Sequence, residues 1–383
     1  MRRLAAVLLV LFVVLAGGCV GTSSSNGTEK ASQQYITVTD SLGRTVQVPV
    51  NVQKVVAIGP GALRLIVYLN ASDMVVGVED FEKKYSYGRP YIIAHPELKN
   101  LPSIGPGGPG KLPNLEALTN VSPPDVIIAV FISREQADEI QEKTGIPVVV
   151  LSYGARGGGM KGFNDPPKLI ESIQLAGKIL HREKRAKELV DFLNSVQEDL
   201  QKRVKGEKSP RVYVGGIGYK GAHGIESTYG DYAPPFEVLN LTNIASSLGP
   251  PGWKTIDKEW LLKEDPDYLF IDEGGLKIIL DDYRKNPDFY RALSALKEGR
   301  VYGLLPFNFY NTNLGTAMAD AYYVGKVLYP ERFSDVDPVK KADEIYTFLV
   351  GKPVYETLKE QFGGFGKIDF ENGTVKYSLP TSP

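Results

Sequence analysis

One long amphipathic segment, residues 166–204, constrains the fold of this chain more than any other feature. Asp165 precedes Pro166, and this order suits a helix start because Asp can cap the first turn and Pro fits within it. Apolar residues then recur at intervals of three and four, which predicts a helix with one buried face. They are Leu169, Ile173, Ala176, Leu180, Ala186, Leu189, Leu193, Val196 and Leu200. A single helix of this length, at about 1.5 Å per residue, would extend roughly 55 Å and join two lobes. Two shorter helices, divided near residues 182–183, are the alternative.

The chain on either side of this segment alternates short apolar strands with helical stretches. Residues 54–78 follow the strand, Gly turn, helix and strand order of a parallel sheet. A helix that leads into Pro-Asp and then a buried strand occurs twice, at 115–129 and 259–271. We therefore expect an α/β fold of two Rossmann-like lobes with central, mostly parallel sheets, joined by one long α-helix. The expected boundaries are 35–164 for the N-terminal lobe, 165–205 for the connecting helix, 206–370 for the C-terminal lobe and 371–383 for a tail.

The first residues are typical of a secretory signal. Arg2 and Arg3 precede an apolar run at 4–16 that is short for a membrane span. Small residues then precede Cys19, the only cysteine of the chain, so we expect a signal peptide over 1–19 with Cys19 as a lipid anchor. Ordinary cleavage beside an incidental cysteine is the alternative. Residues 20–34 are rich in Ser, Gly and Thr, which is typical of a flexible tether. This predicts a folded body anchored to the outer face of the cell membrane.

Composition argues against several classes of function. A net charge of -1 and the lack of a basic stretch with interleaved aromatic residues argue against nucleic-acid binding. A bare transition-metal ion needs several converging ligands, and the three histidines, His95, His181 and His223, are far apart in the sequence. We expect only His223, which lies in a Gly-rich loop after a strand, to be a candidate for ligand contact.

Catalytic motifs are absent from the sequence. There is no Gly-X-Ser-X-Gly or HExxH pattern, and the one cysteine is the expected anchor. Asp272 and Glu273 follow a buried strand, where adjacent acids more often cap the next turn than catalyse a reaction. The protein is therefore not expected to be an enzyme or to need a cofactor.

The candidate ligand-binding residues follow predicted strand ends, where ligands bind in open α/β sheets. Gly loops together with aromatic faces and a few polar tips suit a metal chelate or a macrocycle. The alternative is that many of these aromatic residues belong to the core. The candidates are Gly59, Pro60, Gly61, Arg64, Phe131, Tyr153, Tyr219, Lys220, His223, Asp272, Glu273, Phe307, Asn308 and Tyr310.

Several blocks, in order, resemble the iron-chelate and cobalamin class of substrate-binding proteins of ABC transporters. The resemblance covers nearly the whole mature chain and extends to archaeal proteins of iron-complex uptake. Its blocks are Asp40-Ser-Leu-Gly-Arg-Thr-Val-Gln-Val-Pro, Lys54-Val-Val-Ala-Ile, Asp73-Met-Val-Val-Gly-Val, Asn114-Leu-Glu-Ala-Leu, Pro124-Asp-Val-Ile-Ile-Ala and Val301-Tyr-Gly-Leu-Leu. It implies two rigid lobes that hold a ligand between them.

The resemblance also implies partners. They are a membrane permease with its ATPase and a small-molecule metal complex, bound by a monomeric, membrane-anchored lipoprotein. In that family a Glu on each lobe docks on the permease, and the matching positions are Glu116 and Glu259. The ligand is expected to be an iron chelate such as a ferric siderophore. A molybdate-like oxyanion, a corrinoid or haem is the alternative, and a tethered extracellular enzyme is a more distant one.

Overall fold

The computed structural model describes residues 34–108, 110–120, 123–153, 167–219, 221–230, 234–250 and 252–378. Residues Gln34–Pro383 form one compact unit. The expected signal peptide, Cys19 and nearly all of the tether lie outside the described residues, as does Lys220.

The N-terminal lobe contains a four-stranded sheet in which every pairing is parallel. Its central strand β5 is buried along its whole length, as expected of a strand covered on both faces. An antiparallel hairpin precedes this sheet. The sheet order is β4(Val75–Gly77), β3(Val55–Ile58), β5(Val126–Val130) and β6(Val148–Leu151), and the hairpin is β1(Tyr35–Thr39) with β2(Thr45–Pro49).

The C-terminal lobe contains a five-stranded mixed sheet. Strands β7, β10 and β11 pair in parallel, and β12 and β13 add an antiparallel edge next to β11. The expected tail from residue 371 is partly wrong, because residues 374–376 form β13 against β12. The sheet order is β13(Thr374–Lys376), β12(Gly366–Asp369), β11(Val301–Leu304), β10(Tyr268–Asp272) and β7(Val212–Gly215), with a separate hairpin of β8(Ser227–Tyr229) and β9(Trp253–Thr255).

The repeated Pro-Asp sequence has the same structural role in both lobes. Asp125 precedes β5, and its Oδ2 accepts hydrogen bonds from the backbone N–H of Gln53 at 2.7 Å and Lys54 at 2.9 Å. Asp267 precedes β10, and its Oδ2 accepts from the N–H of Arg211 at 2.9 Å. Each Asp therefore joins the start of a central strand to the chain that enters the neighbouring strand. The two-lobe α/β expectation is confirmed.

The connecting segment is two helices and not the single helix expected over 165–205. The helices are α6(Pro167–Ile179) and α7(Glu183–Arg203). His181 adopts a left-handed conformation with φ 53, and the N–H of Arg182 donates to the carbonyl of Gly177 at 2.7 Å, as in a Schellman end. A Cβ on Gly177 would lie 2.5 Å from that of Ala186, so glycine lets the two helices meet closely. The amphipathic stripe is confirmed, but it continues across a turn.

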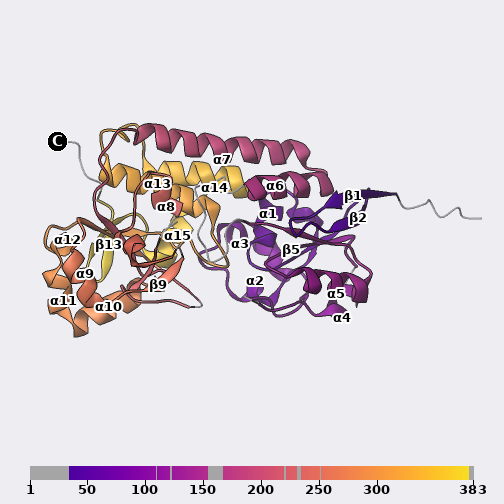
Figure 1. Ribbon diagram of the computed structural model, residues 1–383, viewed down its shortest axis with the longest axis horizontal. Coiled ribbons are helices and arrows are strands. Elements are labelled where there is room, and N and C mark those ends of the chain that lie inside the picture. The colour runs from indigo at the N-terminus through magenta and orange to yellow at the C-terminus, as the bar shows by residue number, and fades with distance from the viewer. Residues whose placement is uncertain are drawn as a thin grey trace, which may run out of the picture. The chain divides into compact units, whose positions relative to one another are not determined.

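The C-terminal helices return to the N-terminal lobe. Figure 1 shows α7 lying alongside α13(Leu314–Leu328) and α14(Pro338–Val350). The rings of Phe192 on α7 and Phe348 on α14 stack at 3.9 Å, and Arg185 donates to the carbonyl of Tyr68 at 2.9 Å. One continuous apolar core includes buried residues from both lobes and from α7. The lobes are therefore joined by packed helices as well as by the connecting chain.

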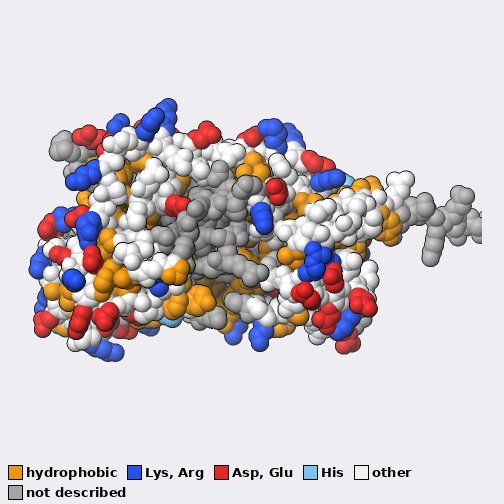
Figure 2. All heavy atoms as spheres, viewed as in Figure 1, with side chains coloured by type: hydrophobic (Ala, Val, Ile, Leu, Met, Phe, Trp, Pro, Cys, Tyr) orange, Lys and Arg blue, Asp and Glu red, His pale blue; other side chains and the backbone are white. Residues whose placement is uncertain are grey.

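The remaining helices lie around these sheets. Of the described helices, none combines the length and the apolar character that crossing a membrane requires. They are α1(Ala62–Tyr68), η1(Ser72–Met74), α2(Asp80–Lys84), α3(Pro90–Ala94), η2(Pro96–Asn100), α4(Leu115–Asn120), α5(Arg134–Thr144), α8(Pro234–Glu237), η3(Ile244–Leu248), α9(Lys258–Glu264), α10(Leu276–Lys285), α11(Pro287–Ala292), α12(Ser294–Lys297) and α15(Tyr355–Phe362). On the face in Figure 2, the described Lys and Arg side chains intermingle with Asp and Glu.

Candidate functional site

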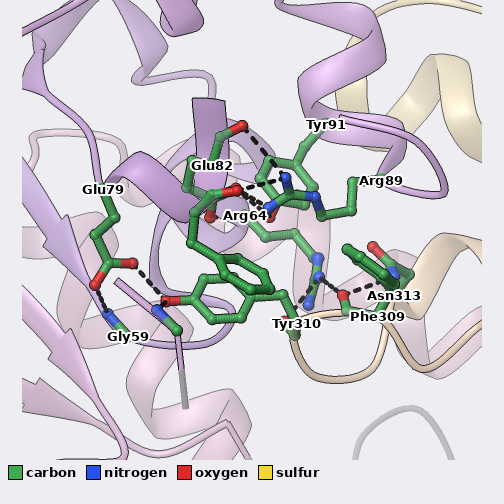
Figure 3. A network of polar contacts seen from close by, with 11 residues as sticks. Gly59, Arg64, Glu79, Glu82, Arg89, Tyr91, Phe309, Tyr310 and Asn313 are labelled. Carbon is green, nitrogen blue, oxygen red and sulfur yellow. Dashed lines mark hydrogen bonds and ion pairs between the residues drawn. The ribbon is translucent and has the colours of Figure 1, made fainter. Parts of the chain in front are cut away.

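The junction between the lobes centres on a loop of the C-terminal lobe, residues 307–313, which follows β11. Arg64 of α1 is fully buried, and its guanidinium donates hydrogen bonds to three carbonyls of this loop. The acceptors are Thr312 at 2.7 Å and Phe309 and Tyr310 at 3.1 Å each. Tyr153, which follows β6, accepts a bond from Arg64 at 3.0 Å and donates to the Thr312 carbonyl at 2.9 Å. Part of this network is drawn in Figure 3.

A second contact joins the same loop to the N-terminal lobe through Glu79, the residue before α2. The hydroxyl of Tyr310 donates to Glu79 Oε2 at 2.6 Å, and the N–H of Gly59 donates to Glu79 Oε1 at 3.1 Å. The Tyr310 hydroxyl also accepts from the N–H of Gly108 at 3.0 Å. Burial raises the pKa of Glu79 to about 7, although the bond from Tyr310 opposes that shift.

A buried ion pair lies beside this contact. Arg89 pairs with Glu82, and its second terminal nitrogen donates to the carbonyl of Phe81 at 3.0 Å. The Tyr91 hydroxyl donates to the same Glu82 carboxylate at 2.9 Å. The guanidinium carbon of Arg89 lies 5.5 Å from the ring centres of both Phe81 and Phe309. The two arginines nearest the loop are thus engaged by protein groups.

The turn after β3 needs its glycines. Gly59 has φ 88, and a Cβ there would lie 2.3 Å from the Val130 carbonyl oxygen at the end of β5. A Cβ on Gly61 would lie 2.9 Å from the Tyr153 ring. The facing loop has two consecutive non-glycine residues in left-handed conformations, Tyr310 with φ 52 and Asn311 with φ 70. Such backbone is rarely adopted unless surrounding contacts determine it.

Tyr219, His223 and Trp253 form a cluster of rings beyond the carboxyl end of β7, which we call the aromatic platform. Tyr219 stacks on Trp253 with ring centres 4.5 Å apart, and the His223 ring lies 5.6 Å from Trp253. His223 Nε2 contacts the Tyr219 carbonyl at 2.6 Å. The Asn308 amide donates to the carbonyl of Gly218 at 3.2 Å, so the interlobe loop also contacts this platform.

Three buried acids lie near the carboxyl ends of β10 and β11: Asp272 is the last residue of β10, Glu273 follows it, and Asp320 lies on α13. Burial raises the pKa of Asp272 to about 7, while the N–H of Gly274 donates to its Oδ1 at 2.9 Å. Burial also raises the pKa values of Glu273 and Asp320 well above their usual range. Glu273 accepts from the N–H of Gly364 at 2.9 Å and Asp320 from that of Leu305 at 3.2 Å. The bond from Gly274 fits the cap role expected for Asp272, whereas Glu273 accepts from a segment that is distant in the sequence. Across the described residues, no cluster of three potential ligands is placed to hold a metal ion.

The structure brings six of the fourteen predicted ligand-binding residues together at the junction between the lobes. The turn at 59–61, Arg64, Tyr153 and Tyr310 meet at the junction, where the Asn311 amide donates to the Pro60 carbonyl at 3.5 Å. Phe307 is fully buried in the core, as the alternative interpretation held. Phe131, at the end of β5, is 43% exposed.

Sequence reasoning missed Glu79, Glu82 and Trp253. The two acids lie in a charged stretch whose sequence resembles a solvated helix start. Trp253 reaches Tyr219 only because β9 pairs with β8, where Trp253 lies opposite Tyr229. No sequence spacing signalled either arrangement.

Replacing Arg64 with Met tests the junction. Arg64→Met retains much of the side-chain volume but leaves three carbonyls without their donor, so we expect a loss of at least about 3 kcal/mol in the free energy of unfolding. Chemical denaturation monitored by circular dichroism measures this loss. Arg284→Met, at an exposed arginine of α10, is the matched control and should change stability by less than about 0.5 kcal/mol. A stability of Arg64→Met within about 1 kcal/mol of the unaltered protein would contradict the prediction.

Asp272→Asn tests the buried acids through the pH dependence of stability. The pKa of Asp272 is raised from 3.8 to about 7, so the folded state holds this proton more tightly than the unfolded state does. The stability due to this proton is complete below pH 4 and is lost as the pH rises through 7, by up to roughly 4 kcal/mol. Asn carries no such proton, so denaturation from pH 4 to 8 should show a flatter profile for the variant. An unchanged profile, equal to that of the exposed control Asp288→Asn, would contradict the prediction.

Comparison with known proteins identifies the family. The sequence profile of the family described as "Periplasmic binding protein" matches residues 55–306. The molybdate-binding protein MolA of Haemophilus influenzae is 26% identical over 331 residues, which cover 81% of this chain and 89% of that protein. The Fe(3+)-citrate-binding protein YfmC of Bacillus subtilis is 25% identical over 304 residues, covering 79% and 89%.

Structural comparison agrees on the fold. The structure of MolA bound to molybdate aligns with a TM-score of 0.65 at 22% identity and covers 83% of this chain and 98% of that one. Relatives of this kind are periplasmic or extracytoplasmic, bind solutes and are not enzymes, and what they hold is a transported ligand and not a cofactor. The chain therefore belongs to the periplasmic binding protein family, whose members are the solute-binding components of ABC importers.

Proposed function

We propose that this protein captures an iron(III) chelate, such as a ferric siderophore, between its lobes and delivers it to the permease and ATPase of an ABC importer. The observation that carries this proposal is an aromatic side chain exposed at the carboxyl end of a strand in each lobe. Phe131 follows β5 and is 43% exposed, and Tyr219 follows β7 and is 39% exposed. Ligands of α/β lobes bind at such strand ends, and aromatic faces suit the organic body of a chelate.

The interlobe loop connects these two aromatic positions. Asn308 contacts Gly218, which precedes Tyr219, while Asn311 contacts Pro60, which follows Gly59. Gly59 in turn packs on the Val130 carbonyl, next to Phe131. A ligand that contacts both aromatic residues would therefore lie against the loop 307–313.

Charge at the junction also favours a chelate over a small bare ion. Arg64 and Arg89 are fully buried and donate to carbonyls, a hydroxyl and a carboxylate of the protein. The terminal nitrogens of both guanidinium groups would have to break those bonds to bind an oxyanion, and the Nε of each arginine is buried without a hydrogen-bond partner among the described residues. A bare cation would need a ligand cluster, and the part of the chain that the structure describes has none.

A free oxyanion such as molybdate or tungstate is the second candidate ligand. The observation that favours it is the similarity to MolA, which binds molybdate. A corrinoid or haem belongs to the same group of alternatives, because large flat ligands also suit aromatic faces.

The proposal includes a lipid anchor and a docking surface. Cys19, as the lipid-attachment residue, would hold a monomeric body at the outer face of the membrane. Glu116 and Glu259 are both exposed, and each is the second residue of a helix, α4 and α9, that leads into a central strand. An acid at the same position of each lobe suits paired contacts with basic groups of a two-fold permease.

Ligand-induced stabilisation tests the choice of ligand. Thermal unfolding of the purified protein should show a higher Tm with a ferric tris-hydroxamate or another ferric chelate, because a ligand at a hundred times its Kd adds about 2.7 kcal/mol. Native mass spectrometry with iron analysis should show a ligand that copurifies. Stabilisation by molybdate or tungstate alone would favour the second candidate. No stabilisation by either class would contradict both.

Charge reversal tests docking. The double variant Glu116→Arg with Glu259→Arg should abolish ligand uptake in cells that express the whole importer, because it places positive charge against the proposed basic contacts. Its ligand affinity in solution should not change. The matched control is Glu135→Arg with Glu356→Arg, since these exposed acids also lie in the first turns of helices. Normal uptake by the first double variant would refute the docking proposal.

A further inference from the structure

The hydrogen-bond donor at the carboxyl end of β3 is already occupied by a carboxyl group of the protein. Gly59 begins the turn after β3, and its N–H donates to Glu79 Oε1 at 3.1 Å. In open α/β sheets, ligands bind outside this edge, and backbone N–H groups there suit anions. Figure 3 shows Glu79 lying between Gly59 and Tyr310. An incoming oxyanion would therefore have to compete with a resident carboxylate.

Packing holds Glu79 in this position. Its side chain is almost fully buried, and a Cβ on Gly107 would lie 2.6 Å from Glu79 Cβ. The second oxygen, Oε2, accepts from the Tyr310 hydroxyl at 2.6 Å, and that hydroxyl accepts from the N–H of Gly108 at 3.0 Å. Both carboxyl oxygens thus have hydrogen-bond donors. The segments that contain Gly59, Gly107 and Tyr310 therefore all meet around the Glu79 side chain.

Few charges face Glu79. Glu82 on α2 raises its proton affinity and Arg89, before α3, lowers it, while Tyr310 donates from the opposite lobe. Arg89 forms its ion pair with Glu82, and among the described residues no ion pair to Glu79 is formed. The Glu79 carboxylate is therefore held mainly by the two neutral donors, Gly59 N–H and the Tyr310 hydroxyl.

We propose that Glu79 selects ligands by charge: its carboxylate keeps free oxyanions from the donors at the end of β3, and oxyanions gain access only when Glu79 takes up a proton. This inference rests on the proposed binding function and specifies the ligand. Above neutral pH the site favours metal complexes without net negative charge, such as a ferric tris-hydroxamate, in which three hydroxamate charges cancel that of iron. A negative ligand beside a buried carboxylate meets little screening.

The second lobe has a matching arrangement. Asp272 Oδ1 accepts from the N–H of Gly274 after β10, and Asp320 Oδ1 accepts from that of Leu305 after β11. The carboxyl ends of strands in both lobes therefore use internal acids as acceptors, and neither presents these donors to a free anion.

Calorimetric titration of the whole protein with sodium molybdate at pH 6 and pH 8 tests the proposal. Since burial raises the pKa of Glu79 to about 7, the protonated fraction falls about tenfold over this range, and molybdate affinity should fall equally. Glu79→Gln should bind molybdate at least about tenfold more tightly than the unaltered protein at pH 8 and lose the pH dependence. Glu135→Gln, at an exposed acid of the same lobe, should behave like the unaltered protein.

A second variant keeps the test decisive if Glu79→Gln fails to fold. Tyr310→Phe removes one donor to the carboxylate, so its pKa should rise and the fall in molybdate affinity should shift to higher pH. The proposal is overturned if molybdate affinity is independent of pH in the unaltered protein, or if neither variant alters molybdate binding. Titration with the ferric tris-hydroxamate, run in parallel, tests the proposed function separately, because its outcome does not depend on molybdate.

Discussion

The junction between the lobes depends on the hydrogen bonds that the buried guanidinium of Arg64 donates to the loop of residues 307–313. The guanidinium supplies donors to three carbonyls of this loop, whose backbone includes two left-handed residues, Tyr310 and Asn311. Without those donors the carbonyls would lie in the junction without hydrogen-bond partners, which is energetically costly for buried groups. One side chain of the N-terminal lobe thereby determines the course of a loop in the other lobe.

The same loop brings the candidate site together. It contacts the Gly turn after β3, the residue before α2 and the aromatic platform after β7, so the elements around a ligand are positioned by one segment. The packed helices α7, α13 and α14 support this arrangement from one side.

Much of the fold was predictable from local patterns. The apolar stripe of the connecting segment, the β3–α1–β4 order and the two Pro-Asp strands each appear in the structure as predicted. The break at His181 was anticipated only by the alternative of two shorter helices, because no proline marks it and the turn depends on the close approach of Gly177 to Ala186. Strand β13 was also missed, since its three residues carry no alternation strong enough to distinguish them from a tail.

The candidate site, like the fold, was only partly predictable from the sequence. Sequence alone determined which turns follow the strands and that these turns carry glycine, aromatic and acidic residues, because strand and turn propensities are local. Only the tertiary structure decided that Arg64 would donate to a loop of the other lobe, that Glu79 would occupy the Gly59 donor, and that Trp253 would stack on Tyr219. These contacts join residues that are distant in sequence, and burial and hydrogen-bond satisfaction, which select them, exist only once the lobes have packed.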